Sequence, residues 1–223
     1  SFDMGGIYPQ IIGAKPVVPA VRSAEFFKIR VGVFLETSDP QFIRHVKPSR
    51  RARLKERPQS VYFLYGSAHK SIKPFASFLP GISGLWGIPM WVFYVNRGQA
   101  IAGFGIQDKD HPIMEFLPAN RAYRSVPLNG FRTFLKLGPK NRQIFYEPFQ
   151  APLPGDRSPA QQRMRIRMHD LMLEERHPRL GLEVRVQYFT IPHEPFAALA
   201  RTVTITNRSR KTLDVELLDG LPA

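Results

Sequence analysis

Residue types that bind sugars gather in the middle of the chain. Binding sites for small molecules combine apolar or aromatic walls with a few polar groups that fix the ligand, and amide and guanidinium groups hydrogen-bond to hydroxyls. The stretch from residue 86 to residue 132 contains both kinds of side chain. The candidate carbohydrate-binding residues are Trp86, Arg97, Gln99, Asn120, Tyr123 and Arg132. For each of them we favour an ordinary place in a core or a turn.

Catalytic chemistry is harder to build from this sequence. Glycoside hydrolysis uses two carboxylic acids on opposite sides of a sugar, and the candidate pairs are Asp108 with Asp110 and Glu174 with Glu175. Residues two apart on a strand share one face, which crowds Asp108 and Asp110 on one side. The six histidines are widely spaced, and no Gly-x-Ser-x-Gly or phosphate-loop motif is present. We therefore predict no catalytic residue, no metal site and no cofactor.

The net charge of +14 is the strongest feature of the composition, and a dense basic run lies between residues 44 and 57. Such an excess can serve nucleic acid, an anionic membrane or an anionic substrate. The run has no interleaved aromatic residues to stack on bases, so we interpret it as a solvated loop or a partner-facing surface. No apolar run approaches the roughly 18 residues that a membrane helix needs. With no cysteine and no visible signal peptide, we expect a cytoplasmic protein without a membrane partner.

The elements that position these residues are predicted to be strands. The 21 prolines and 16 glycines disfavour long helices, and the best short helix candidate, residues 159–163, is marginal. Strand patterns begin at residues 26–35 and 61–65 and continue to the end of the chain. We expect an all-β fold: a large antiparallel β-sandwich of the supersandwich type over residues 61–223, on which an irregular, basic, Pro-rich segment, residues 1–60, packs.

A hairpin predicted over residues 90–106 is the most informative element. Two apolar runs flank residues 96–99, where Gly98 can supply the positive φ that a tight turn demands. Trp91 and Phe93 share one face of the first run. We expect these two rings to anchor the core between the sheets; the alternative is that Trp91 is an exposed platform for a sugar.

Alternation also runs through the last third of the chain. Residues 163–169 and 182–190 are predicted to pair, with facing Arg and Glu side chains on a wet surface. Residues 199–218 are predicted to close the domain as a hairpin. Within the earlier hairpin, Gly103 and Gly105 lie on one face and leave room for a bulky neighbour or a close backbone approach.

Residues 84–137 resemble the amino-terminal region of large bacterial cellobiose phosphorylases, which are relatives of glycoside hydrolase families 94 and 161. Residues 200–223 resemble the sandwich strands that precede the linker into a helical barrel in those proteins. The likeness covers residues 60–223. It is carried mainly by Asn96-Arg97-Gly98-Gln99, Phe104-Gly105, Glu115-Phe116 and Pro118-Ala119-Asn120.

The resemblance implies a β-sandwich that leads into an (α/α)6 barrel, with the barrel carrying a general-acid Asp and the phosphate site. Enzymes of this kind cleave a β-glucosidic bond with inorganic phosphate as co-substrate and release α-glucose 1-phosphate with inversion. Phosphate takes the place of the activated water, so that one carboxylic acid suffices. No residue of this chain matches a catalytic position, so the chain alone is expected to be inactive.

The expected partners follow from the same resemblance: the catalytic barrel of the same or another chain, a β-glucan oligosaccharide, and a second subunit in a homodimer. Both ends of the chain look cut, and we expect a fragment that stops before the linker and barrel. A free-standing carbohydrate-binding module is the alternative, and it would carry an exposed line of aromatic residues across one sheet face. A polyanion-binding domain built on the basic run is the less favoured alternative, because nucleic acid is not the expected partner.

Overall fold

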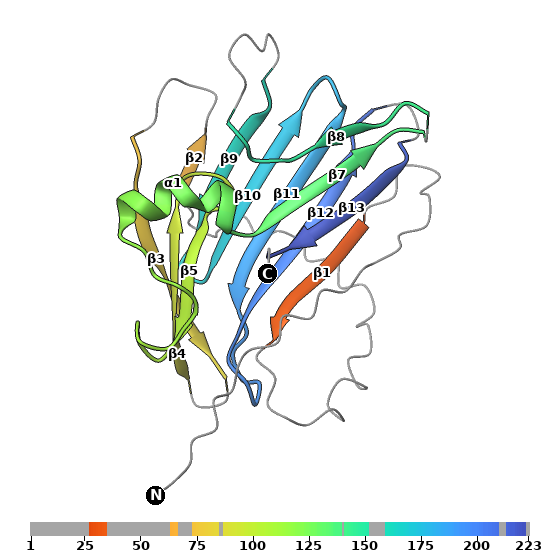
Figure 1. Cartoon of the computed structure of the whole chain (residues 1–223). Coiled ribbons are helices and arrows are strands. Elements are labelled where there is room, and N and C mark those ends of the chain that lie inside the picture. Colours follow the sequence, from red (N-terminus) through yellow and green to blue (C-terminus); the bar gives the residue numbers. More distant parts are fainter. Residues whose placement is uncertain are drawn as a thin grey trace, which may run out of the picture.

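Strands dominate the described part of the chain, as the sequence predicts. The computed structural model describes residues 27–34, 63–66, 73–84, 87–139, 141–151, 159–209 and 213–221. In this part, three antiparallel sheets and one helix form an all-β sandwich (Figure 1). The basic run at residues 44–57 and the candidate Trp86 lie outside the described residues.

One layer of the sandwich is a six-stranded sheet. Along β11 the side chains alternate, with Leu182, Val184, Val186 and Tyr188 buried and their neighbours half-buried, which is the pattern of a strand with one face on the core. The strands, in spatial order, are β1 (Phe27–Phe34), β12 (Ala198–Asn207), β11 (Leu182–Thr190), β10 (Asp170–His177), β9 (Gln161–Ile166) and β2 (Phe63–Gly66).

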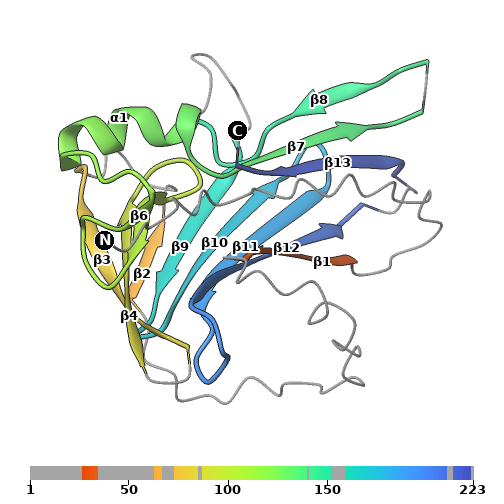
Figure 2. The same ribbon diagram turned by 60° about the horizontal axis from the view of Figure 1, so that its bottom comes forward.

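The other layer is made of two smaller sheets. Figure 2 shows β7, β8 and β13 lying over the six-stranded sheet, with β3 to β6 beside them. One hydrophobic cluster joins all three sheets, since it contains Val92, Leu135 and Val186 together. The three-stranded sheet has the order β13 (Val215–Gly220), β7 (Arg132–Leu137), β8 (Ile144–Tyr146), and the four-stranded sheet has the order β3 (Ala76–Ser83), β4 (Ile88–Val95), β5 (Ile101–Ile106), β6 (Pro112–Met114).

A helix that the sequence analysis missed, α1 (Ala119–Asn129), covers part of the outer face of the four-stranded sheet, over Val95 and Ala102. It begins after Pro118, whose carbonyl accepts the amide of Ala122 over 2.9 Å. Ala122 and Val126, four residues apart, pack with Val95 in a second, smaller core. In the part of the chain that the structure describes, no helix is long and apolar enough to cross a membrane.

Three predictions of local structure are wrong. Residues 159–163, the expected short helix, run into strand β9 instead. The predicted pairing of residues 163–169 with residues 182–190 is also wrong, because β10 lies between β9 and β11. The predicted closing hairpin does not form: β12 pairs with β1 and β11, whereas β13 pairs with β7 in the other layer.

The hairpin of β4 and β5 is confirmed, but its two faces are exchanged relative to the prediction. Val92 and Tyr94 face the core between the layers, and both are buried. Phe93 lies in the smaller core under α1, and Trp91 is 44% exposed. The expectation that Trp91 anchors the core is therefore wrong. Gly98 does adopt the positive φ expected of it, at +57°.

Candidate functional site

Four aromatic rings lie together on the outer face of the four-stranded sheet; we call this group, Phe78, Trp91, Phe93 and Phe116, the aromatic face. Phe78 and Trp91 are 46% and 44% exposed. Their ring centroids are 5.5 Å apart with the ring planes at 90°. The ring centroids of Phe93 and Phe116 lie 5.0 and 6.3 Å from that of Phe78. Two large rings are thus held open to solvent on a packed base.

Strand register explains why these rings share one face. Phe78 of β3 is paired with Phe93 of β4. Trp91, two residues before Phe93 on β4, is paired with Gly105 of β5. The glycine lets the chain fold back closely, because a Cβ at Gly105 would lie 2.6 Å from the carbonyl oxygen of His111. The returning segment therefore lies directly against β5, next to Trp91. This is the close backbone approach that the glycines predict.

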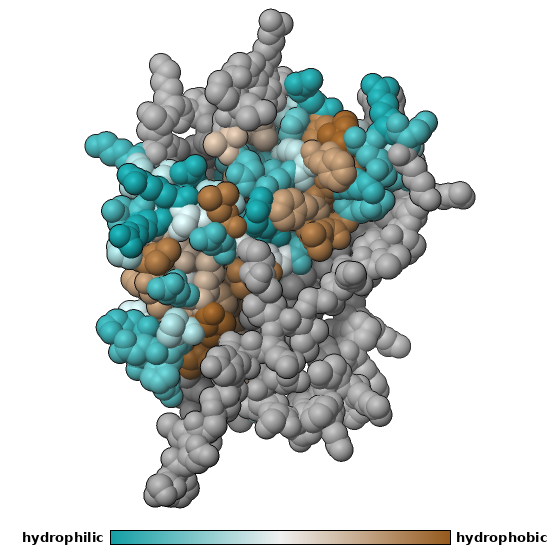
Figure 3. Space-filling model, viewed as in Figure 1, coloured by the Kyte–Doolittle hydropathy of each residue, from teal (hydrophilic) through white to brown (hydrophobic). Residues whose placement is uncertain are grey.

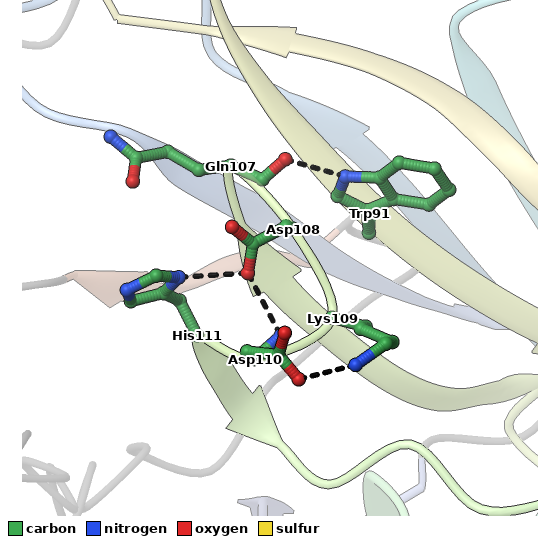
Figure 4. Close-up of polar contacts among 6 residues, drawn as sticks. All are labelled: Trp91, Gln107, Asp108, Lys109, Asp110 and His111. Atoms are coloured by element: carbon green, nitrogen blue, oxygen red, sulfur yellow. Dashed lines mark hydrogen bonds and ion pairs between the residues drawn. The ribbon is translucent and has the colours of Figure 1, made fainter.

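A short loop, residues 107–111, fixes the orientation of Trp91 (Figure 4). The indole Nε1–H donates to the carbonyl oxygen of Gln107 over 2.7 Å. Gln107 adopts a φ of +67°, and its backbone N–H donates to the carbonyl oxygen of Pro89 over 2.8 Å. The loop is in this way tied to the start of β4 at the same point where it holds the ring.

Asp108 organises the tip of this loop. Its Oδ1 accepts the backbone amide of Asp110 over 2.8 Å and lies 2.8 Å from Nδ1 of His111. The hydrogen bond from the His111 side chain, followed by the one from the Asp110 backbone, lowers the pKa of Asp108 below its ordinary value. Asp108 is therefore a carboxylate at neutral pH. Its second oxygen, Oδ2, takes part in neither contact and can accept from a ligand hydroxyl.

The arrangement suits a ligand with one apolar face and hydroxyl groups at its edge. An oriented indole and a neighbouring phenyl ring offer flat apolar area, and the indole does so at little cost in side-chain entropy, because its hydrogen bond already holds it. The carboxylate of Asp108 lies in the same loop as Gln107, which binds the indole of Trp91, and is available as a hydrogen-bond acceptor (Figure 4). A pyranose has both of these features.

Three of the sequence-predicted residues lie on or beside the N-terminal half of α1. The guanidinium of Arg97, in the turn between β4 and β5, lies 5.4 Å from the ring centroid of Tyr123. Asn120 is exposed in the first turn of the same helix, three residues before Tyr123. Tyr123 also packs against the smaller core that contains Phe93. This group lies on the same outer face as the aromatic face.

The other predicted residues are elsewhere. Gln99 is only 2% exposed, and its Oε1 accepts from Arg201 over 2.8 Å inside the sandwich, so its amide is not offered to a surface ligand. Arg132 belongs to the three-stranded sheet, where it forms a two-pronged pair with Glu147, both bonds 2.7 Å long. Its guanidinium carbon also lies 4.5 Å from the ring centroid of Phe134.

Neither carboxylate pair has the geometry of glycoside hydrolysis. Asp110 pairs with Lys109 at the exposed loop tip, while Asp108 is bound as described above. Glu174 forms ion pairs with Arg165 at 3.1 Å and Arg185 at 2.9 Å. Glu175 points to the opposite side of β10, into the protein, where it accepts from Tyr146, from the amide of Phe149 and from Gln162.

Comparison with known proteins adds no family. No family model matches the chain, and no curated protein matches it significantly. Among the described residues, no group of three or more His, Asp or Glu side chains is placed to hold a metal ion. The aromatic face, with the loop at residues 107–111, is the candidate functional site.

Proposed function

We propose that this chain is a non-catalytic β-sandwich domain of a carbohydrate-active enzyme and that it holds a β-glucan chain on the aromatic face. The observation that carries the proposal is the pair of exposed rings, Phe78 and Trp91, on a packed sheet. An exposed large aromatic pair is unusual on a protein surface unless it meets a ligand or a partner.

The fixed orientation of Trp91 supports a binding role. A ring that is held by a hydrogen bond to Gln107 loses little freedom when a ligand stacks on it. The proposed ligand is neutral, so its affinity comes from stacking and from hydrogen bonds to its hydroxyl groups, and not from net charge. Affinity should therefore depend only weakly on salt, unlike the affinity of a polyanion.

The enzyme class proposed is that of the inverting β-glucoside phosphorylases, on the strength of the sequence resemblance. In this proposal the general acid and the inorganic phosphate belong to a catalytic helical barrel, in the same chain or another, and the sandwich holds the glucan near it. A free-standing carbohydrate-binding module is the second candidate, because the exposed rings are the feature that distinguishes such a module from a sandwich with a buried aromatic line.

Calorimetric titration of the purified chain with β-glucan oligosaccharides tests the proposal. We expect binding that changes little between low and physiological salt. Asp108→Asn should weaken it, whereas Asp214→Asn, an exposed carboxylate beside β13, should not. No detectable heat with any β-linked glucan, or binding that collapses as salt is raised, would remove the sugar-binding assignment.

The purified chain used for the titration should release no glucose 1-phosphate from β-glucan and phosphate, because the described residues include no acid pair flanking a ligand site. Phosphorolysis by this chain alone would contradict the non-catalytic reading. Glucose 1-phosphate release that appears only when a catalytic barrel is joined to the chain would distinguish the enzyme domain from the free-standing module.

A further inference from the structure

The outer face of the six-stranded sheet, the side turned away from the core, is rich in arginine. Alternate residues of β9, β10 and β11 point inward, and Met164, Leu173 and Val184 are buried there. The residues between them point outward. We call four outward side chains of these strands the arginine face: Arg163, Arg165, Arg176 and Arg185.

Strand register gathers the arginine face around one carboxylate. Glu174 of β10 is directly opposite Arg163 on β9 and Arg185 on β11. Its carboxylate forms ion pairs with Arg165 at 3.1 Å and with Arg185 at 2.9 Å. Arg176 follows two residues later on β10 and therefore points to the same side. One carboxylate thus lies among four arginines.

The carboxylates of this side of the sheet do not neutralise its arginines. Glu183, which is opposite Arg176 in the register, binds Arg208 at 2.9 Å. The side chains of Glu174 and Glu183 are only 12% and 18% exposed. Arg163 and Arg176, in contrast, are both exposed, and neither forms an ion pair with any described residue. The surface that a partner would meet therefore carries an excess of positive charge.

The two outer faces of the sandwich differ in character. In the other layer, exposed apolar side chains gather over β7, β8 and β13 (Figure 3), and these include Phe134, Phe145 and Leu218. Of the four residues of the arginine face, the two exposed ones are Arg163 and Arg176. A partner of the arginine face is therefore recognised by charge and hydrogen bonds, and not by apolar area.

The charges also indicate which kind of partner fits. A guanidinium presents a planar fork of N–H donors that matches a carboxylate. A second copy of this chain would also carry +14 and would be repelled. A nucleic acid fits less well, because its continuous phosphates would meet Glu174 and Glu183 as well as the arginines. A protein can instead place single carboxylates over the two exposed arginines and neutral groups over the glutamates.

We infer that the arginine face is a docking surface for an acidic segment of another protein, whose carboxylates pair with Arg163 and Arg176. Thr204, which is opposite Arg185 on β12, adds a hydroxyl donor beside the guanidinium groups. The inference stands on the arginine face alone and does not depend on sugar binding. The aromatic face belongs to the other layer, so both surfaces can be occupied at once.

Fluorescence anisotropy with a labelled peptide of alternating glutamate and serine tests the inference. In an extended peptide of this sequence all glutamates lie on one side. We expect saturable binding to the full chain, which weakens as salt is added. Arg163→Gln combined with Arg176→Gln should weaken the affinity at least about tenfold, because both carboxylate pairs are lost. The melting temperature of this variant should stay close to that of the wild type, since neither arginine has an ion-pair partner among the described residues.

A charge-matched variant separates docking from long-range attraction. Arg121→Gln combined with Arg124→Gln removes the same charge from exposed positions of α1, in the other layer. This control should bind the peptide nearly as tightly as the wild type. Equal losses in the two double variants, or no saturable binding by the wild type, would overturn the inference.

A single-stranded oligonucleotide of the same length and label identifies the class of partner. We expect it to bind the wild type more weakly than the peptide does at physiological salt. Tighter binding of the oligonucleotide, lost in the variant with Arg163→Gln and Arg176→Gln, would assign the arginine face to nucleic acid and would also overturn the inference.

Discussion

Arg201 of β12 and Asp219 of β13 form an ion pair that joins the two layers of the sandwich away from solvent. The guanidinium also donates to Gln99 and to Thr133, each over 2.8 Å. Thr133 in turn donates to the other oxygen of Asp219 over 2.7 Å. The two buried charges are therefore matched by hydrogen bonds to each other and to neutral side chains, which is the condition under which a buried pair is tolerated.

Removing one member of this pair should be costly. Asp219→Ala leaves Arg201 charged and buried without its carboxylate, and we expect the free energy of unfolding to fall by about 3–5 kcal/mol. Arg201→Met combined with Asp219→Leu should recover much of that loss, because no buried charge remains. Denaturant unfolding of the three proteins measures this. A cost below about 1 kcal/mol for Asp219→Ala would show that the pair is accessible to solvent.

The carboxyl of Glu175 predicts a pH dependence of stability. Burial raises its pKa above the ordinary value, although hydrogen bonds from Tyr146, Phe149 and Gln162 act in the opposite direction. As pH rises above the ordinary Glu pKa of about 4.3, the unfolded chain loses this proton before the folded chain does. The contribution of Glu175 is then fully present below that pH and is lost as pH rises towards the folded pKa.

Chemical denaturation at several pH values checks this sign. Glu175→Gln keeps the shape of the side chain but cannot ionise, so its stability should fall less between pH 4 and neutrality than that of the wild type. Glu174→Gln is the matched control, because Glu174 lies on the other face of β10 between two arginines. Identical pH profiles for the wild type and Glu175→Gln would contradict the assignment.

The turn of the β4–β5 hairpin depends on Gly98. With φ at +57°, a β-branched residue is strained there, and its γ carbons would meet Pro127, whose Cα lies 3.4 Å from an ideal Cβ. Gly98→Val should lower the melting temperature, at a cost of about 1–2 kcal/mol. Gly98→Asn should cost less, because Asn tolerates the left-handed region. Equal melting temperatures for the two variants would argue against the turn geometry.

The sequence predicts the strands of this protein better than their pairing. Period-2 alternation correctly indicates which residues of β11 face inward, because burial of one sheet face is a local signal. Pairing depends on elements distant in sequence. Residues 171–177 contain the charges Glu174, Glu175 and Arg176, which hide the pattern of a central strand. In the sheet these carboxylates have partners on the neighbouring strands, two arginines for Glu174 and Gln162 for Glu175.

The aromatic face shows why the candidate site was only partly predictable. Both faces of β4 are apolar, so its pattern cannot tell which one meets the main core. The glycines of β5 carry the missing signal. Gly105 and Gly103 are paired with Trp91 and Phe93, and they face the segment that returns along β5. Helix α1 carries a proline, Pro127, inside it, which is unfavourable in a helix, yet the spacing of Ala122 and Val126 and the terminal Gly130 are helical signals.

The central claim, that Trp91 is a binding surface and not a core residue, is tested by two measurements on one variant. We expect Trp91→Ala to lower affinity for β-glucan at least about tenfold, equivalent to about 1.4 kcal/mol, while its melting temperature stays close to that of the wild type. Phe104→Ala, which truncates a fully buried ring on the neighbouring strand, should instead cost about 3–5 kcal/mol of stability. A Trp91→Ala variant that melts as early as Phe104→Ala, or that binds glucan as tightly as the wild type, would contradict the claim.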